Sequence, residues 1–265
     1  MNWNKNKYMS FFKEFKEFIK SILSWVCFLL GFSFFFFLFG LKEIEILGKN
    51  IFLPLPTLQS FSSQIFRKIQ QDLLPSGVQL IVTNPLSAFL AQVLISLLLA
   101  FIITSPFFLY KTMKYLSPAL FEKEKKVIIR VLFPSVFLFF LGCLFAYFLL
   151  IPSTFKALYP FAAIIGAIPF FLVNEFISLV FGLMLVSGII FLLPVFMILL
   201  NSLGIVKADF WKNNWRYAFL IFLIFSAIIT PDGTGITMVM LSVPLTGLYF
   251  LGTIITMKNG RINNK

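Results

Sequence analysis

Six stretches of the chain carry almost no charge and are long enough to cross a bilayer. Because a helix rises about 1.5 Å per residue, crossing roughly 30 Å of hydrocarbon takes about 20 apolar residues. The pattern therefore predicts six transmembrane helices, near residues 19–40, 88–110, 127–151, 175–200, 214–230 and 237–255. The predicted fold is all-α: a polytopic membrane protein in which residues 1–265 form a single membrane domain.

The distribution of basic residues predicts the topology. Cytoplasmic loops of membrane proteins are enriched in Lys and Arg. With six spans and both termini on the cytoplasmic side, 17 of the 22 basic residues lie inside. Counting the uncharged segment 157–174 as a seventh span would divide them evenly. We therefore expect six spans, with residues 152–174 forming an outer loop that contains Pro160, Gly166 and Pro169.

The longest loop, residues 41–87, is predicted to lie outside. Within it, Phe61–Leu74 places apolar residues at helical spacing. This predicts a short amphipathic helix that lies on the outer membrane surface.

Composition supports this class and excludes others. The chain is 60% hydrophobic and only 12% charged, whereas soluble domains are about a quarter charged. It has no His and two Cys, so His-dependent catalysis and His-ligated metals are excluded. A net charge of +12 fits inner loops beside an anionic leaflet better than nucleic-acid binding.

The spans lack the groups that membrane chemistry requires. Ion-coupled transporters keep ionisable residues at membrane depth, and enzymes need a nucleophile with a base. Here the acidic residues collect at the span edges. We therefore predict a non-enzymatic protein without cofactor or metal.

Acidic residues at the inner margin are the concentrated polar feature. Glu14 and Glu17 lie in an amphipathic N-terminal segment, and Glu122 and Glu124 lie among lysines between the second and third spans. One interpretation is a solvated, charge-mixed margin. The other is a pair of carboxylates that binds a cationic partner, since carboxylates bind guanidinium groups with bidentate geometry.

An ordered set of motifs resembles the TatC family, the polytopic receptor subunit of the twin-arginine protein translocase. The set comprises the N-terminal FFKEFKEFI, the stretch Ser105–Pro152 with its P-A-L block and G-x-x-F-A-Y-F motif, and the later T-P-D turn. It covers about residues 11–255 in the right order. One departure is Leu192, where the family often has Glu or Gln in its fourth span.

The resemblance implies a receptor that binds twin-arginine signal peptides of folded precursor proteins and transports them with single-span partners of the TatA and TatB type. It also implies a homo-oligomer within a larger complex in the lipid bilayer. The implied signal-peptide contacts are Glu14, Lys16, Tyr115, Pro118 and Glu124. The implied partner-helix docking edge and its lumenal turn carry Pro231, Asp232 and Thr237.

Two other functions stay open from the sequence: a small-molecule or ion permease, and a structural subunit of another membrane complex. For location, the Phe-, Lys-, Ile- and Asn-rich composition indicates AT-rich coding, and LYFLG near the C-terminus resembles the plastid and cyanobacterial branch. We expect a plastid thylakoid membrane, with the inner face toward the stroma, and a bacterial plasma membrane as the alternative.

Overall fold

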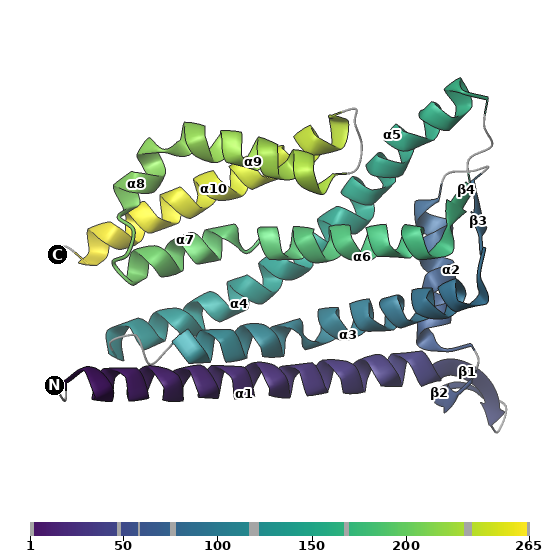
Figure 1. The fold of residues 1–265 in the computed structure, drawn as a ribbon, viewed down its shortest axis with the longest axis horizontal. Helices are drawn as coiled ribbons and strands as arrows, with labels where there is room; N and C mark the ends of the chain where they lie inside the picture. Colours follow the sequence, from purple (N-terminus) through teal and green to yellow (C-terminus); the bar gives the residue numbers. More distant parts are fainter. Residues whose placement is uncertain are drawn as a thin grey trace.

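The structure is a bundle of long helices with small strands at one end (Figure 1). It is a computed structural model that describes residues 3–46, 49–57, 59–74, 78–116, 122–166, 170–230 and 235–263. Five stretches are long and apolar enough to cross a membrane, and Trp215–Ile229 is a shorter apolar helix. The five are Ile19–Leu38, Pro85–Thr112, Leu132–Ala162, Val173–Ser202 and Ile236–Lys258.

The elements follow one another as a series of crossings. The N-terminal half contains α1 (Trp3–Leu38), β1 (Phe39–Ile46), β2 (Lys49–Pro56), α2 (Phe61–Leu73), β3 (Gln79–Ile81) and α3 (Pro85–Leu116). The middle contains α4 (Glu122–Phe145), η2 (Ala146–Leu150), α5 (Ile151–Ile164) and β4 (Phe170–Leu172). The remainder contains α6 (Val173–Ile190), α7 (Leu193–Ser202), α8 (Ala208–Asn213), α9 (Trp215–Ile229) and α10 (Ile236–Asn263).

The two ends of the bundle differ. The start of α1, the end of α3, the start of α4, α8 and the end of α10 lie at one end, which we call the terminal end (Figure 1). The β1–β2 pair, α2 and the β3–β4 pair lie at the other, which we call the hairpin end. Two termini at one end fit an even number of crossings, as the charge distribution predicts.

The segment predicted as an outer loop, 152–174, is helical over its first half, so that prediction was wrong. Helix α4 continues through η2 into α5 as far as Ile164. Proline lacks an N–H and usually breaks the helical ladder. Here the π-helical turn shifts the hydrogen bonds just before Pro152, so that the N–H of Ile151 bonds to the carbonyl of Ala146. The chain thereby continues helically through Pro152, and α5 also contains Pro160.

The fourth crossing is divided rather than continuous. Helix α6 ends at Ile190, and α7 begins at Leu193 with Pro194 at its start. Proline favours the first turn of a helix because its missing N–H is not needed there. The N–H of Phe191 still bonds to the carbonyl of Ser187, so the two helices follow closely on one another.

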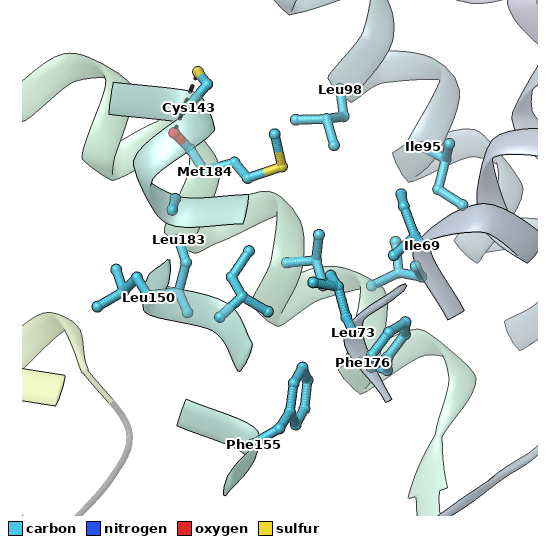
Figure 2. Close-up of a cluster of buried hydrophobic side chains, with 14 of the residues drawn as sticks. Ile69, Leu73, Ile95, Leu98, Cys143, Leu150, Phe155, Phe176, Leu183 and Met184 are labelled. Carbon is cyan, nitrogen blue, oxygen red and sulfur yellow. Dashed lines mark hydrogen bonds between the residues drawn. The ribbon is translucent and has the colours of Figure 1, made fainter. Parts of the chain in front are cut away.

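Helix α2 lies at the hairpin end and packs against the rest of the bundle (Figure 1). Ser60 caps it, with its hydroxyl accepting from the N–H of Ser63. Its apolar face buries Ile69 and Leu73 in the main core. Figure 2 shows these side chains beside Ile95 of α3. The predicted amphipathic face therefore contacts other helices.

The core lies where α2, α3, α4, η2, α5, α6 and α10 meet. Phe155 and Phe176 are fully buried with their ring centroids 5.3 Å apart, and Cys143 donates to the carbonyl of Met184 at 3.7 Å (Figure 2). Small residues allow the close approach: a Cβ at Gly142 would come within 2.7 Å of the backbone oxygen of Ser187. This small-residue contact between α4 and α6 is typical of membrane helix packing.

Candidate functional site

Helix α1 runs antiparallel to α3 with a register fixed by two polar contacts inside the bundle. The Ser33 and Ser96 hydroxyls lie 3.0 Å apart, and the Trp25 indole N–H donates to Thr104 Oγ1 at 3.2 Å. From the first contact to the second, the residue number falls by eight in α1 and rises by eight in α3. The pairing register of the two antiparallel helices is therefore constant over this length.

The same register extends toward the terminal end. The Lys111 ammonium donates to the carbonyl of Ser21 at 3.5 Å, so contact between the helices continues past Trp25. Eleven residues beyond the Trp25 contact on each helix are Glu14 and Tyr115. The backbone positions of these two predicted site residues are therefore level with each other across the α1–α3 pair.

The other predicted signal-peptide contacts occupy the same end. Lys16 lies in α1 with an exposed side chain, and Glu124 is the third residue of α4, which starts beside the end of α3 (Figure 1). Pro118 lies outside the described residues. Four of the five positions thus belong to three helix segments that meet at the terminal end.

The second predicted site lies at the α9–α10 connection. Pro231 and Asp232 lie outside the described residues. Thr237 is the second residue of α10 and is fully buried within the chain. Its side chain is consequently inside the protein rather than on a docking face. Thr230, just before the turn, donates its hydroxyl to the Ser226 carbonyl at 2.9 Å, which closes the end of α9.

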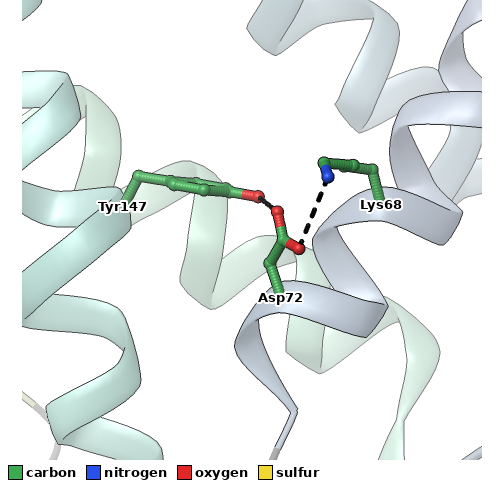
Figure 3. Close-up of polar contacts among 3 residues, drawn as sticks. All are labelled: Lys68, Asp72 and Tyr147. Atoms are coloured by element: carbon green, nitrogen blue, oxygen red, sulfur yellow. Dashed lines mark hydrogen bonds and ion pairs between the residues drawn. The ribbon is translucent and has the colours of Figure 1, made fainter.

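A polar contact between α2 and η2 was not predicted. The Tyr147 hydroxyl donates to Asp72 Oδ2 at 2.7 Å, and the Lys68 ammonium lies 3.8 Å from Asp72 Oδ1 (Figure 3). Lys68 and Asp72 are spaced i,i+4 on α2, a pairing visible in the sequence. The participation of Tyr147 depends on η2, which no sequence pattern indicated.

Two open apolar grooves lie along the bundle. One, of about 480 Å³, runs along α1. The other, of about 450 Å³, lies between the α6–α7 junction and α9. The second is lined by Ile189, Ile190, Leu192, Leu193, Phe196, Ile221, Phe222, Phe225 and Leu245. Their linings suit hydrocarbon chains or apolar helices rather than a polar solute.

The described residues contain no group of three or more Cys, Asp or Glu side chains that could hold a metal ion, and the chain has no His. Within the described spans the buried polar side chains are chiefly Ser and Thr. These features define the class of the protein: a polytopic helical membrane protein whose charged residues lie mainly outside its apolar spans.

Comparison with known proteins identifies the family. The family model for the Sec-independent protein translocase protein TatC matches residues 15–244. The chain belongs to the TatC family. Since the match spans nearly all crossings, it applies to the whole bundle rather than to a part of it.

Relatives of known family match the sequence of this chain over more than half of their own length. A Sec-independent protein translocase protein TatC of Cenarchaeum symbiosum is 36% identical over 92% of this chain and 93% of its own. That of Aquifex aeolicus is 34% identical over 76% and 86%. A chloroplastic TATC of Pisum sativum is 27% identical over 76% and 57%.

The fold has also been seen experimentally. The crystal structure of a twin-arginine translocase receptor TatC matches with a TM-score of 0.71 and 27% identity, covering 92% of this chain and 98% of that one. A second crystal structure of this receptor, in DDM, gives 0.72 and 28%. The predicted all-α polytopic fold and the predicted family are thereby confirmed.

Proposed function

We propose that this chain is the receptor and core subunit of a twin-arginine translocase, and that it binds twin-arginine signal peptides at its terminal end. The observation that carries the proposal is the family match over residues 15–244. The register that makes Glu14 level with Tyr115 supports the choice of site. Folded precursor proteins would then be passed across the membrane with partner subunits.

The proposed chemistry is charge recognition. Glu14 on α1 and Glu124 on α4 each accept a guanidinium group of the paired arginines, because carboxylates and guanidinium groups form short, charge-assisted hydrogen bonds. Lys16, Tyr115 and Pro118 shape the site around the peptide. Lysine in place of arginine at residue 16 supplies a point charge instead of a planar fork.

The test is crosslinking of a twin-arginine precursor that carries a photoreactive group beside its arginines. We expect Glu14→Ala and Glu124→Ala each to lower crosslinking by about tenfold, the value of one hydrogen bond to a charged group. Both variants should still insert into the membrane. A precursor with paired lysines serves as the matched cargo control.

Glu175→Ala is the matched protein control, because Glu175 is exposed in the first turn of α6 at the hairpin end (Figure 1). It should leave crosslinking unchanged. Unchanged crosslinking in both Glu14→Ala and Glu124→Ala would refute the site.

We further propose that single-span subunits of the TatA and TatB type dock along α9 and α10 near Pro231 and Asp232, in a complex with several copies of this chain. Thr237 acts there as an internal support, since it is buried. Copurification from native membranes tests both claims. Isolation of this chain alone under conditions that preserve precursor binding would refute them.

We propose a plastid thylakoid membrane as its location, with a bacterial plasma membrane as the alternative. The composition and the similarity to a chloroplastic relative support this choice. Immunodetection of the chain in fractionated thylakoid and envelope membranes is the direct test.

A further inference from the structure

A basic and aromatic cavity lies at the corner between α8 and α9. It has a volume of about 570 Å³ and is as open to its surroundings as the apolar groove beside α9. Its lining consists of Lys212, Asn213, Trp215, Arg216 and Tyr217. Basic side chains and aromatic rings share this lining, in contrast to the two apolar grooves. The α8–α9 corner that carries these residues lies at the terminal end (Figure 1).

The two cations in this cavity have no carboxylate partner within the described part of the chain. The ion pair between Lys68 and Asp72 lies away from this cavity, on α2 at the hairpin end. Arg216 instead lies over the Trp215 ring, 5.6 Å from its centroid. Unpaired basic groups beside exposed aromatic rings are suited to an anionic ligand at a membrane interface.

The corner that carries them is held firmly. The Tyr249 hydroxyl of α10 donates to the Trp211 carbonyl of α8 at 2.6 Å. The Trp215 ring packs against Phe250, with centroids 6.0 Å apart. The backbone that carries the two cations is therefore attached to α10 at Trp211 and Trp215.

Two exposed apolar rows run down α9 from this cavity. Arg216 is followed at four-residue spacing by Leu220, Ile224 and Ile228, which are 55%, 54% and 76% exposed. Tyr217 heads the neighbouring row, which continues through Ile221 and Phe225. Residues four apart lie on one face of a helix, so each row presents a polar head above an apolar strip.

Helix α9 is short, which brings the lipid headgroups close to the cavity. Its 15 residues span about 22 Å, about 8 Å less than the usual hydrocarbon thickness. A short span is accommodated by local thinning of the bilayer and by basic side chains reaching the interface. The headgroup layer is consequently drawn toward the level of Arg216 and Tyr217.

We propose that this cavity binds the anionic headgroup of a membrane lipid, with Lys212 and Arg216 contacting its phosphate and the acyl chains lying on the row that Arg216 heads. The Tyr217 row, whose Ile221 and Phe225 line the second apolar groove, stays open to the proposed partner helices. The charge complementarity and the continuous polar-to-apolar layout favour a lipid over an acidic protein segment. The site is independent of signal-peptide binding, so its test does not require a precursor.

The test is native mass spectrometry of the full chain released from nanodiscs that contain phosphatidylglycerol and phosphatidylcholine. Wild type should retain phosphatidylglycerol preferentially. The double variant K212Q/R216Q should bind it about thirtyfold more weakly, because each basic side chain at an anionic surface contributes about a factor of five. Arg216→Lys should restore part of the preference.

The matched control is K20Q/K258Q, which removes two exposed cations from outside the cavity. It should retain phosphatidylglycerol as wild type does. Equal retention by K212Q/R216Q and the control would overturn the proposal. Displacement of the lipid by inorganic phosphate would assign the cavity to a free anion and overturn the lipid assignment. Retention that appears only with a copurified acidic protein would assign it to a protein partner.

Discussion

The Tyr147 hydroxyl donates a 2.7 Å hydrogen bond to Asp72, which joins η2 to α2 (Figure 3). The two residues are 75 positions apart in the chain. Helix α2 also packs Ile69 and Leu73 into the core. Helix α2 is therefore held to the bundle by a hydrogen bond as well as by apolar packing. The hydrogen bond is made at η2, the π-helical turn of the third crossing.

Removing this hydroxyl should loosen α2. We expect Tyr147→Phe to lower the free energy of unfolding by about 1 kcal/mol, the net value of a single hydrogen bond. Hydrogen exchange of the α2 backbone should accelerate correspondingly, while exchange in α9 stays unchanged. Lys68→Gln should cost less than about 0.5 kcal/mol, because the ammonium is exposed and its ion pair is long.

A double-mutant cycle separates this bond from general damage. Tyr147→Phe and Asp72→Asn should each destabilise the protein, and the double variant should cost less than their sum. Strict additivity of the two losses would contradict a direct bond between the residues.

A glycine on α4 should be intolerant of substitution. A Cβ at Gly142 would meet the Ser187 backbone oxygen at 2.7 Å and the Gly188 Cα at 2.9 Å. Because these are backbone atoms, Gly142→Ala must move α4 away from α6. We expect a loss of about 1–3 kcal/mol in unfolding free energy, measured by thermal unfolding in detergent.

Gly182→Ala is the matched control. Gly182 lies on α6 with no atom within 4 Å of its added Cβ, so the substitution should be neutral or slightly stabilising. Equal losses for Gly142→Ala and Gly182→Ala would show that the close approach of α4 and α6 is not what limits residue size.

The sequence was informative wherever hydrophobicity alone decides structure. Charge-free runs marked the membrane crossings, and the spacing in Phe61–Leu74 marked α2, observed as Phe61–Leu73. These patterns reflect transfer into a bilayer or onto a core, which acts on each segment by itself. The family followed from ordered motifs that run along the same segments.

Features that depend on distant or unusual backbone pairing were missed. Strand β3 pairs in parallel with β4, which lies some ninety residues later. The β1–β2 hairpin spans a segment predicted only as loop, and β2 contains Pro54 and Pro56. Prolines normally argue against a strand, but a two-stranded sheet has outer edges where they are tolerated.

The candidate signal-peptide site was only partly accessible from the sequence. Spacing placed Glu14 and Glu124 at the inner margin, but it gave no register between helices. That register comes from Ser33–Ser96 and Trp25–Thr104, polar contacts between residues that are ordinary in any span. Such pairings become visible only when the helices are assembled.

The α1–α3 register predicts specific crosslinks. On a background without Cys27 and Cys143, the pair S33C/S96C should form a disulfide on mild oxidation, because the native hydroxyls are 3.0 Å apart. The pair E14C/Y115C should be joined by a short bifunctional thiol reagent. A protease site engineered between α1 and α3 allows the chain to be cut there. A crosslink keeps the two fragments together, so they migrate as one band on a denaturing gel.

The pair E14C/T104C is the negative control. Its members are offset by eleven residues along the helices, or about 16 Å, beyond the reach of a short reagent. Efficient crosslinking of E14C/T104C, with none in E14C/Y115C, would mean that the register does not continue to the terminal end.

Leu192 should tolerate apolar but not acidic substitution. It lines the apolar groove beside Phe196 and Phe225. A carboxylate placed at membrane depth without a partner costs about 2.5–3.5 kcal/mol. We therefore expect Leu192→Glu to lower the unfolding free energy by about 2–3 kcal/mol in the isolated chain, while Leu192→Met changes it little.

Ile205→Glu controls for added charge, because Ile205 is exposed in the connection between α7 and α8 at the terminal end. If Leu192→Glu were as stable as Ile205→Glu, a polar group or water would have to reach the groove, and its apolar character would be disproved.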